Sequence, residues 1–350
     1  MAPIEPLVPE VLSHWSALRG GAASRFGTGL INDTWRVDAP AGVFVLQRLH
    51  KAFGPSVHDD IAAVTAHLAA QAMPTPRLVP SDAGALWVSP RGAPETVWRV
   101  QTFVPGSRAF DKVTGPAMAA EAGALVGRWH RAMQGFAHRY AHRRGGVHDT
   151  AAHLERLHRA LAAPRDRTYL DEVRALADEV TAAYATLPDL RDDPLRHCHG
   201  DLKLSNLLFD EAGRGLCLID LDTLGEMRLA HELGDALRSW CNRAGEDSTE
   251  AIFDVAVFTA AVQGFFESAA GCVSPRERAH LVGGLRALCL ELTMRFLEDT
   301  VLASYFGYNA EKYPSRAAHN RVRALGQWSL YRAVTRDAAA LEAVVASIAP

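Results

Sequence analysis

The sequence predicts an α+β protein in two parts: an antiparallel sheet with one helix over residues 1–104, and a mainly helical part over residues 105–350. Two observations predict this fold class. In the first part, stretches such as ASRFGTGLINDTWRV and GVFVLQRL alternate apolar and polar residues, as half-buried strands do. From Thr114 onward, the apolar residues recur at helical spacing instead. Pro105 and Gly106 mark the change between the two patterns.

The first part begins with a short predicted helix over 9–18 and continues as strands. A turn at residues 26–29, FGTG, lies between two of these strands. Its glycines would let backbone amides approach phosphate oxygens closely, although hairpin turns also use glycine for their own geometry. Residues 58–71 are predicted to form an amphipathic helix, and PTPRLVPSDAGALWV and ETVWRVQTFVPG to form two further strands.

The second part is predicted to be built from long helices. Leu125, Trp129 and Met133 recur every four residues and place one face of the first helix in the core. Ser274 opens a capping box, with proline at the next position, and predicts the start of a long helix through Leu297. The predicted helices cover about 114–134, 168–187, 231–242, 274–297 and the residues from 316 onward.

Residues 197–223, HCHGDLKLSNLLFDEAGRGLCLIDLDT, contain the side chains best suited to chemistry. Asp201 can accept a hydroxyl proton, and Asn206, five residues later, can face the same phosphate group and hold a magnesium ion through its amide oxygen. The segments LLFD and LCLIDLD read as two short strands joined by a glycine-containing turn. Such a hairpin would bring Asp220 back beside Asn206, and two oxygen ligands there would suit magnesium.

A single D-x-x-x-x-N motif is commonplace and usually caps a loop. Here it follows HxHG and precedes a hairpin and IDLD at a suitable interval, which is the arrangement of the protein-kinase template. This context favours phosphoryl transfer from a magnesium nucleotide.

The composition limits the kinds of partner that the protein is expected to bind. The net charge is −3, from 37 basic and 40 acidic residues, so the chain lacks the strong positive charge that binds nucleic acid. A small substrate is therefore expected. No secretory signal is expected at the N-terminus, and the apolar window 251–270 contains Asp254 and Glu267, which predicts a buried helix and no membrane contact. Five cysteines without a C-x-x-C pair predict reduced thiols in a cytoplasmic protein, and no zinc-site spacing is present.

The motifs HGD…N and IDLD resemble those of the aminoglycoside phosphotransferase and choline kinase group of small-molecule kinases. Further motifs from Gly27 to about Arg323 are similar to the N-acetylhexosamine 1-kinase branch: GxINDTW, FVLQRLH, AAVTAHL, VWRVQTFVPG, VHDT, LIDLDT, GDALR and MRFLEDTVLASYFGY. The resemblance implies a bilobal, protein-kinase-like fold. It also implies ATP-dependent phosphorylation of the anomeric hydroxyl of an N-acetylhexosamine, with one or two Mg²⁺ ions.

The resemblance also implies site residues. Asp201 would be the base and contact the acceptor, and Asn206 and Asp220 would bind Mg²⁺. In the strand VFVLQRL, Gln47 takes the place where kinases usually have a phosphate-pairing lysine, so Arg48, another cation or a heavier reliance on magnesium must compensate. The remaining expected site residues are Gly27, Thr28, Gly29, Gln101 and Phe103 for the nucleotide, Asp222, Arg295 and Tyr305 for the acceptor, and His199 and Asp235 in support.

Several alternatives stay open at this point. Asp222 is either a second acid beside the metal or a residue that orients a ligand, and Arg295 could form a salt bridge on a helix surface. The acceptor could be an aminoglycoside, choline, homoserine or another sugar. A non-catalytic nucleotide-binding protein, and either a monomer or a homodimer, also remain possible.

Overall fold

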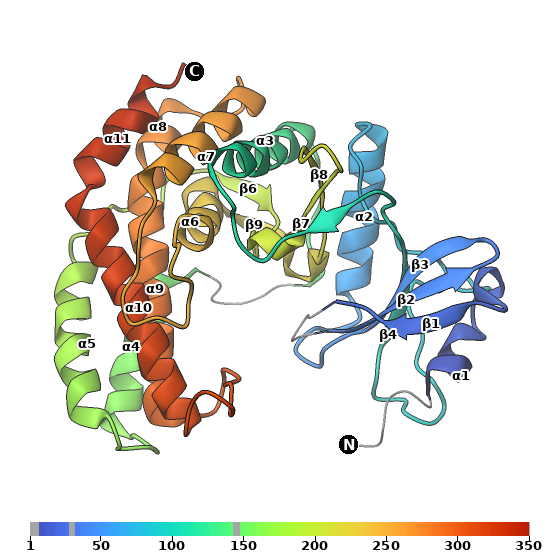
Figure 1. Cartoon of the computed structure of the whole chain (residues 1–350), viewed down its shortest axis with the longest axis horizontal. Helices are drawn as coiled ribbons and strands as arrows, with labels where there is room; N and C mark the ends of the chain where they lie inside the picture. Colours follow the sequence, from blue (N-terminus) through green and yellow to red (C-terminus); the bar gives the residue numbers. More distant parts are fainter. Residues whose placement is uncertain (1–6, 28–31, 143–147, 350) are drawn as a thin grey trace. The chain divides into compact units, whose positions relative to one another are not determined.

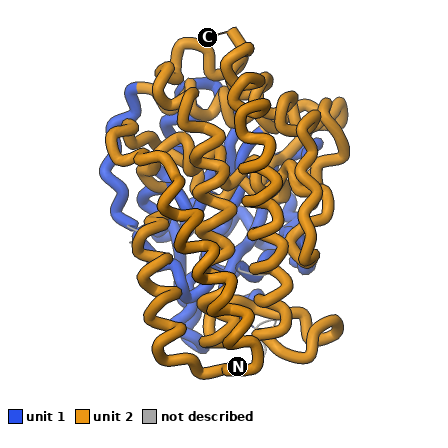
Figure 2. The backbone as a smooth tube through the Cα atoms, turned by 90° about the vertical axis from the view of Figure 1, so that its left-hand side faces the viewer, with its two compact units in different colours: residues 1–107, 135–143, 217–224 blue, residues 108–134, 144–216, 225–350 orange. Residues whose placement is uncertain are grey.

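A computed structural model describes residues 7–27, 32–142 and 148–349, which divide into two compact units (Figure 2). The first unit comprises residues 1–107, 135–143 and 217–224, and the second comprises 108–134, 144–216 and 225–350. The first unit therefore includes residues 105–107, 135–143 and 217–224, which the sequence prediction placed in its second part. The domain boundary expected after residue 104 stays a prediction.

The first unit is built on a four-stranded antiparallel sheet in the order β1-β2-β3-β4 (Figure 1). The strands are β1 (Ala22–Arg25), β2 (Asp33–Ala39), β3 (Gly42–Arg48) and β4 (Trp98–Thr102). The helical elements within residues 1–107 are α1 (Val8–Leu12), the 3₁₀ turn η2 (Ser16–Leu18) and α2 (Val57–Ala70). The helix predicted over 9–18 is thus two short elements, whereas the helix predicted over 58–71 is confirmed.

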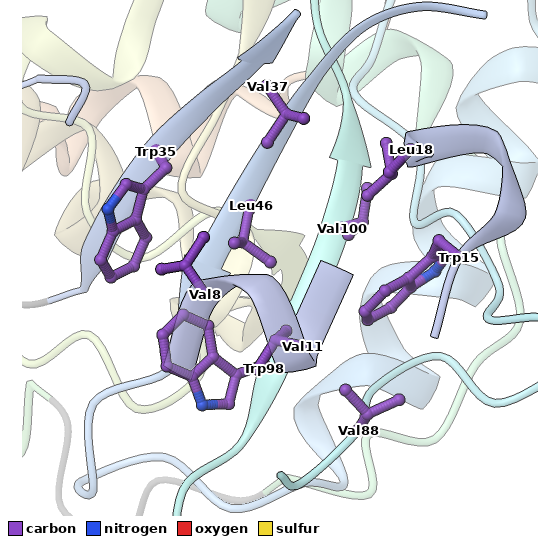
Figure 3. Close-up of a cluster of buried hydrophobic side chains, with 10 residues drawn as sticks. All are labelled: Val8, Val11, Trp15, Leu18, Trp35, Val37, Leu46, Val88, Trp98 and Val100. Atoms are coloured by element: carbon purple, nitrogen blue, oxygen red, sulfur yellow. The ribbon is translucent and has the colours of Figure 1, made fainter. Parts of the chain in front are cut away.

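One face of this sheet forms an apolar core with α1 and η2 (Figure 3). Side chains alternate between the two faces of a strand, so Trp35 of β2, Leu46 of β3 and Trp98 of β4 share this face. The Trp35 and Trp98 rings stack with their centroids 5.2 Å apart. The core cluster consists of Val8, Val11, Trp15, Leu18, Trp35, Val37, Leu46, Val88, Trp98 and Val100.

One predicted strand is wrong. The segment 74–88 has no strand of its own, and Leu78 and Val88 form only isolated bridges to Gln101 and Trp98 of β4. The segment contains three prolines, which lack the backbone N–H of a ladder and fix φ. Alternation of side chains therefore predicted more regular pairing than this backbone can form.

The second unit is mainly helical, as predicted (Figure 1). Its helices are α3 (Pro116–Ala132), α4 (Thr150–Ala162), α5 (Leu170–Tyr184), α6 (Leu229–Trp240), α7 (Val255–Ser268), α8 (Pro275–Ala279), α9 (Leu281–Leu302), α10 (Arg316–Arg336) and α11 (Ala338–Ser347). Its short strands are β5 (Arg108–Ala109), β6 (Leu195–Cys198), β7 (Leu207–Phe209) and β9 (Gly225–Arg228), while β8 (Gly215–Leu218) runs from the second unit into the first. Helix α9 is central to the unit and packs against α4, α5, α6 and α10.

The helix predicted from Ser274 is shorter than expected. The capping box is present, but it opens the five-residue α8, and the long helix α9 begins afterwards at Leu281. The buried helix expected within 251–270 is confirmed as α7, whereas α4 was not predicted. Among the described residues, no helix combines the length and the apolar character needed to cross a membrane.

Candidate active site

Asp201 and Asn206 lie together in the loop between β6 and β7 of the second unit. The amide nitrogen of Asn206 donates hydrogen bonds to the backbone oxygen of Asp201 at 2.8 Å and to its Oδ2 at 3.0 Å. Lys203 Nζ donates to the same Oδ2 at 2.9 Å. Because the Asn206 amide nitrogen faces Asp201, the amide oxygen is the atom that this side chain can offer to a cation. The spacing of the two residues therefore brings them into contact, and their chemical roles stay predictions.

One face of α6 holds this loop in place. Glu232 accepts hydrogen bonds from the backbone amides of His199 at 2.8 Å and Gly200 at 3.0 Å. Trp240, further along the helix, donates from Nε1 to the backbone oxygen of Leu202 at 2.8 Å. Gly200 has a φ of +81°, a left-handed conformation that glycine adopts without steric cost. The loop conformation is thus fixed by its own glycine and by side chains of a packed helix.

Glu232 anchors this loop, whereas sequence analysis expected a supporting role for Asp235. Asp235 instead accepts a hydrogen bond from Arg238 at 2.8 Å. Burial raises the pKa of Glu232 to about 7, against the lowering effect of the two amide hydrogen bonds. The available signal was the stripe Glu232, Ala236 and Trp240 on the buried face of α6, since a buried acid needs polar partners.

The His199 ring is buried, and its Nδ1 accepts a hydrogen bond from the Asp201 backbone at 3.3 Å. Its supporting role in the reaction stays a prediction. Nearby, His130, Cys198 and Glu232 bring possible metal-ligand atoms within 4.8 Å of one another. Burial lowers the pKa of His130 to about 3 and raises that of the Cys198 thiol well above its usual value. A protonated thiol is a poor ligand, and Glu232 already binds the loop, so we interpret this cluster as structural support.

Asp220, the third predicted residue, belongs to the first unit. It precedes the 3₁₀ turn η4 (Leu221–Thr223) and has a left-handed backbone, with φ 62° and ψ 55°. This conformation is uncommon for residues other than glycine, and such strain clusters at functional sites. The convergence of Asp220 with Asp201 and Asn206 of the second unit stays a prediction.

Asp222 is buried in the first unit and uses both carboxylate oxygens. Arg99 donates to Oδ1 from Nη1 and to Oδ2 from Nη2, the latter at 2.9 Å, and Asn32 Nδ2 donates to Oδ2 at 2.7 Å. Burial acts to raise the pKa of Asp222, but Arg99 and Asn32 outweigh it and hold the pKa below its usual value. These contacts favour an orienting role for Asp222, and a contact with the acceptor stays a prediction.

The residues expected at the nucleotide lie mostly on the first unit. Gly27 has a φ of +79° and no heavy atom within 4 Å of the place of a Cβ, whereas Thr28 and Gly29 lie outside the described residues. Phe103, just past β4, meets the Phe26 ring edge-on with centroids 6.0 Å apart. The neighbourhood of Gly27 and that of Phe103 are therefore close within this unit.

The other expected nucleotide residues are Gln101 and the pair Gln47 and Arg48. Gln101 pairs with Val45 in the ladder between β3 and β4. Arg48 donates from Nε to Asp33 at 2.8 Å, whereas the Gln47 oxygen accepts hydrogen bonds from Arg99. The two neighbours thus have separate partners, and their contacts with a nucleotide stay predictions.

The sequence model of the phosphotransferase enzyme family matches residues 22–262 of this chain. These residues include both the sheet of the first unit and the loop of Asp201. The chain belongs to this family. The enzyme class that residues 197–223 predicted is therefore confirmed, and the chain is a phosphotransferase.

Solved structures of related proteins share the fold of this phosphotransferase. An aminoglycoside phosphotransferase from Alicyclobacillus acidocaldarius has a TM-score of 0.64 at 17% identity, over 99% of this chain and 97% of that one. A choline/ethanolamine kinase family protein from Mesorhizobium loti has a TM-score of 0.59 at 19% identity, over 95% and 96%. An amicoumacin kinase, solved with AMP-PNP and Ca²⁺, has a TM-score of 0.58 at 13% identity, over 97% and 92%. These likenesses confirm the α+β, protein-kinase-like fold.

The phosphotransferase brings the two expected sugar contacts together in its second unit. The Arg295 guanidinium of α9 lies 5.9 Å from the ring centroid of Tyr305 and 5.4 Å from that of Phe306. Asp299, one turn after Arg295, accepts hydrogen bonds from the backbone amides of Ser304, Tyr305 and Phe306 at 2.7, 2.8 and 2.8 Å. Tyr305 is 71% exposed, so its ring is accessible, and its contact with a sugar stays a prediction.

Proposed function

We propose that this phosphotransferase is an ATP- and Mg²⁺-dependent kinase for a hydroxyl group of a small molecule, most specifically the anomeric hydroxyl of an N-acetylhexosamine. The observation that supports the reaction best is the direct contact of Asn206 with Asp201 in a loop held by Glu232 and Trp240. A base needs a fixed position to orient a hydroxyl, and this loop supplies one.

In the proposed reaction, Asp201 accepts the proton of the acceptor hydroxyl and aligns its oxygen with the γ-phosphorus of ATP. The new oxygen–phosphorus bond forms as the bond between the γ-phosphorus and the bridging oxygen breaks, and ADP leaves with that oxygen. Phosphoryl transfer has a loose transition state, so orientation and charge neutralisation supply most of the acceleration. Lys203 adds a cation beside Asp201.

The residues present suit a magnesium ion. The Asn206 amide oxygen and the Asp220 carboxylate would hold it, and both are the hard oxygen ligands that Mg²⁺ prefers. When bound, Mg²⁺ neutralises charge on the phosphate oxygens.

The sugar is proposed from the resemblance to the N-acetylhexosamine 1-kinase branch together with the paired Arg295 and Tyr305. Solved proteins with this fold are described as acting on aminoglycosides, choline or ethanolamine, and amicoumacin, so these acceptor classes are the main competitors.

A screen of acceptors tests the proposal. The protein is incubated with Mg-ATP and, separately, an N-acetylhexosamine, an aminoglycoside, choline, ethanolamine and homoserine. ADP release is measured, and the product is identified by phosphorus NMR. We expect release with the N-acetylhexosamine and a phosphate resonance coupled to the anomeric proton.

Other outcomes separate the parts of the proposal. Release with choline or an aminoglycoside alone would contradict the sugar and keep the kinase. A protein that binds Mg-ATP but turns over none of these acceptors would support the non-catalytic alternative.

A further inference from the structure

The strand position of Gln47 shows which side chains share its surroundings. In the sheet, Gln47 of β3 lies opposite Thr34 of β2 and Arg99 of β4. Side chains alternate along strands, so these three point to one face, and Leu46 and Val100 point to the apolar core on the other. Arg48 follows Gln47 and therefore belongs to the opposite face, where it binds Asp33. Arg48 is thus poorly placed to replace a lysine at position 47.

Arg99 is the cation beside this position. Its Nε and Nη2 donate to the side-chain oxygen of Gln47 at 3.0 and 2.8 Å, and Nη1 and Nη2 donate to the two oxygens of Asp222. The exposed fraction of Arg99 is 0%. His58 of α2 also lies near Arg99, and burial, followed by the charge of Arg99, lowers its pKa to about 4, so it adds no second positive charge at neutral pH.

Asn32 also holds Asp222 in place. Asn32 donates to Asp222 with its amide nitrogen and, with its amide oxygen, accepts from the backbone of His50 at 2.9 Å. A buried ion pair adds little stability over an apolar replacement, but in some proteins it defines the geometry of the groups that it joins. Here the joined groups are strand β4 and the turn η4, and the residue two positions before Asp222 is Asp220.

We propose that Arg99 is a positioning residue for the metal segment: through the Gln47–Arg99–Asp222 network it holds η4 against the sheet and so sets the place of Asp220. This inference rests on the proposed role of Asp220 as a Mg²⁺ ligand. Arg99 exposes no surface, and all three guanidinium nitrogens donate hydrogen bonds to Gln47 or Asp222. It therefore holds protein groups and does not pair with phosphate. The glutamine follows from the same network, since a lysine at position 47 would put a second cation against the guanidinium.

The test compares four variants by isothermal titration calorimetry of ATP, with saturating Mg²⁺ and with EDTA. The variants are Arg99→Met, Gln47→Lys, the double variant Gln47→Lys/Arg99→Met, and the exposed-surface control Arg77→Met. We expect Arg99→Met to lower the gain in ATP affinity that Mg²⁺ provides by about tenfold or more, as loss of a residue that orients a metal ligand does. Affinity in EDTA should stay unchanged.

The double variant is the most specific readout. Gln47→Lys alone should lose the Mg²⁺-dependent gain in ATP affinity, because the lysine adds a cation beside Arg99. The double variant should recover part of this gain, because the ammonium group on β3 can then pair with Asp222. Arg77→Met should behave as the wild type. Should Arg99→Met fail to fold, Arg99→Lys keeps the charge without the forked geometry and is expected to show the same loss in a weaker form.

Two results would overturn the inference. An equal loss of affinity in EDTA would mean that Arg99 contacts phosphate, and a wild-type Mg²⁺ gain combined with a lower Tm would mean that the network only stabilises the fold. Failure of the proposed function looks different: without a Mg²⁺ site the wild-type protein would show no Mg²⁺-dependent gain, and without kinase activity it would show the gain but no ADP release with any acceptor.

Discussion

At the scale of single residues, Asp201 has the most definite expected effect. Asp201→Asn keeps the size of the side chain but removes the group that accepts a proton. We expect turnover to fall by about 10²- to 10⁴-fold, the usual contribution of a general base. Mg-ATP affinity should stay near the wild-type value, because Asp201 is not a proposed metal ligand. Steady-state kinetics and calorimetric titration with Mg-ATP measure the two effects.

Asp171→Asn, on the exposed first turn of α5, is the matched control and should change neither quantity. An Asp201→Asn protein that keeps most of its turnover would remove Asp201 from the mechanism.

The predictability of site residues depends on how far apart they lie in the chain. Asp201 and Asn206 could be paired from sequence because a short loop limits where their side chains reach. Glu232 was harder to select, because helical periodicity places Glu232, Ala236 and Trp240 on one face but does not show that this face meets the loop. The partnership of Arg99 with Asp222 spans 123 positions and depends on sheet register, which the sequence does not reveal.

At the scale of elements, close packing of α3 against α7 depends on glycine. A Cβ added at Gly264 would lie 2.1 Å from the backbone oxygen of Ala120, and one added at Gly123 would lie 1.9 Å from that of Ala261. Backbone atoms cannot rotate away, so the helices would have to separate. We expect Gly264→Ala to lower the free energy of unfolding by about 1–3 kcal/mol, as overpacking does.

Urea unfolding monitored by circular dichroism measures this change. Gly307→Ala is the matched control, because nothing lies within 4 Å of its added Cβ, and its φ is not in the left-handed region. Equal stability of the two variants would show that α3 and α7 are not held at this distance.

A buried polar cluster joins α9 to the start of α4 and predicts a pH dependence. Glu291 of α9 accepts a hydrogen bond from Thr150 at 3.3 Å and lies 3.2 Å from His148 Nδ1. Burial acts to raise the pKa of Glu291, but His148 outweighs it and the pKa falls to about 2, whereas its ordinary value is 4.5. The pairing also raises the pKa of His148.

The sign of the effect follows from proton binding. As pH falls below 4.5, the unfolded chain binds a proton at Glu291 while the folded chain does not, so the stabilisation present above pH 4.5 is lost toward pH 2. We expect wild type to lose about 2 kcal/mol relative to Glu291→Gln between about pH 6 and pH 3. Urea unfolding across this range tests the expectation, with Glu342→Gln on the exposed side of α11 as control. Parallel curves for wild type and Glu291→Gln would contradict the depressed pKa.

The elements themselves were predictable where one pattern was long and uninterrupted. The periodicity of residues 114–134 and the apolar window 251–270 gave α3 and α7 because packed helical faces determine both. The prediction failed at residues 74–88, where proline overrides alternation, and at Ser274, where a correct capping box opens only α8. A local cap specifies the start of a helix but not its length.

At the scale of the whole molecule, the chain returns to its first unit late in the sequence. Residues 217–224, which include Asp220 and Asp222, belong with the N-terminal sheet, although the preceding loop of Asp201 belongs to the second unit. Sequence alone could not assign this segment, because LCLIDLD has the apolar pattern of any buried strand. The order of the motifs along the chain therefore does not give their distribution between units.

This distribution predicts how ligand binding affects stability. If Asn206 and Asp220 hold the same Mg²⁺, a substitution in either unit should abolish the same stabilisation. Mg-ATP at about 100 times its dissociation constant should raise the free energy of unfolding by about 2.7 kcal/mol. We expect Asn206→Ala and Asp220→Ala each to lose the part of this increase that EDTA removes from the wild type, measured by scanning calorimetry. The controls Glu95→Ala in the first unit and Asp178→Ala in the second, both exposed, should keep it. Loss in only one of the two ligand variants would exclude the other residue from the metal site, and retention in both would contradict the proposed metal site as a whole.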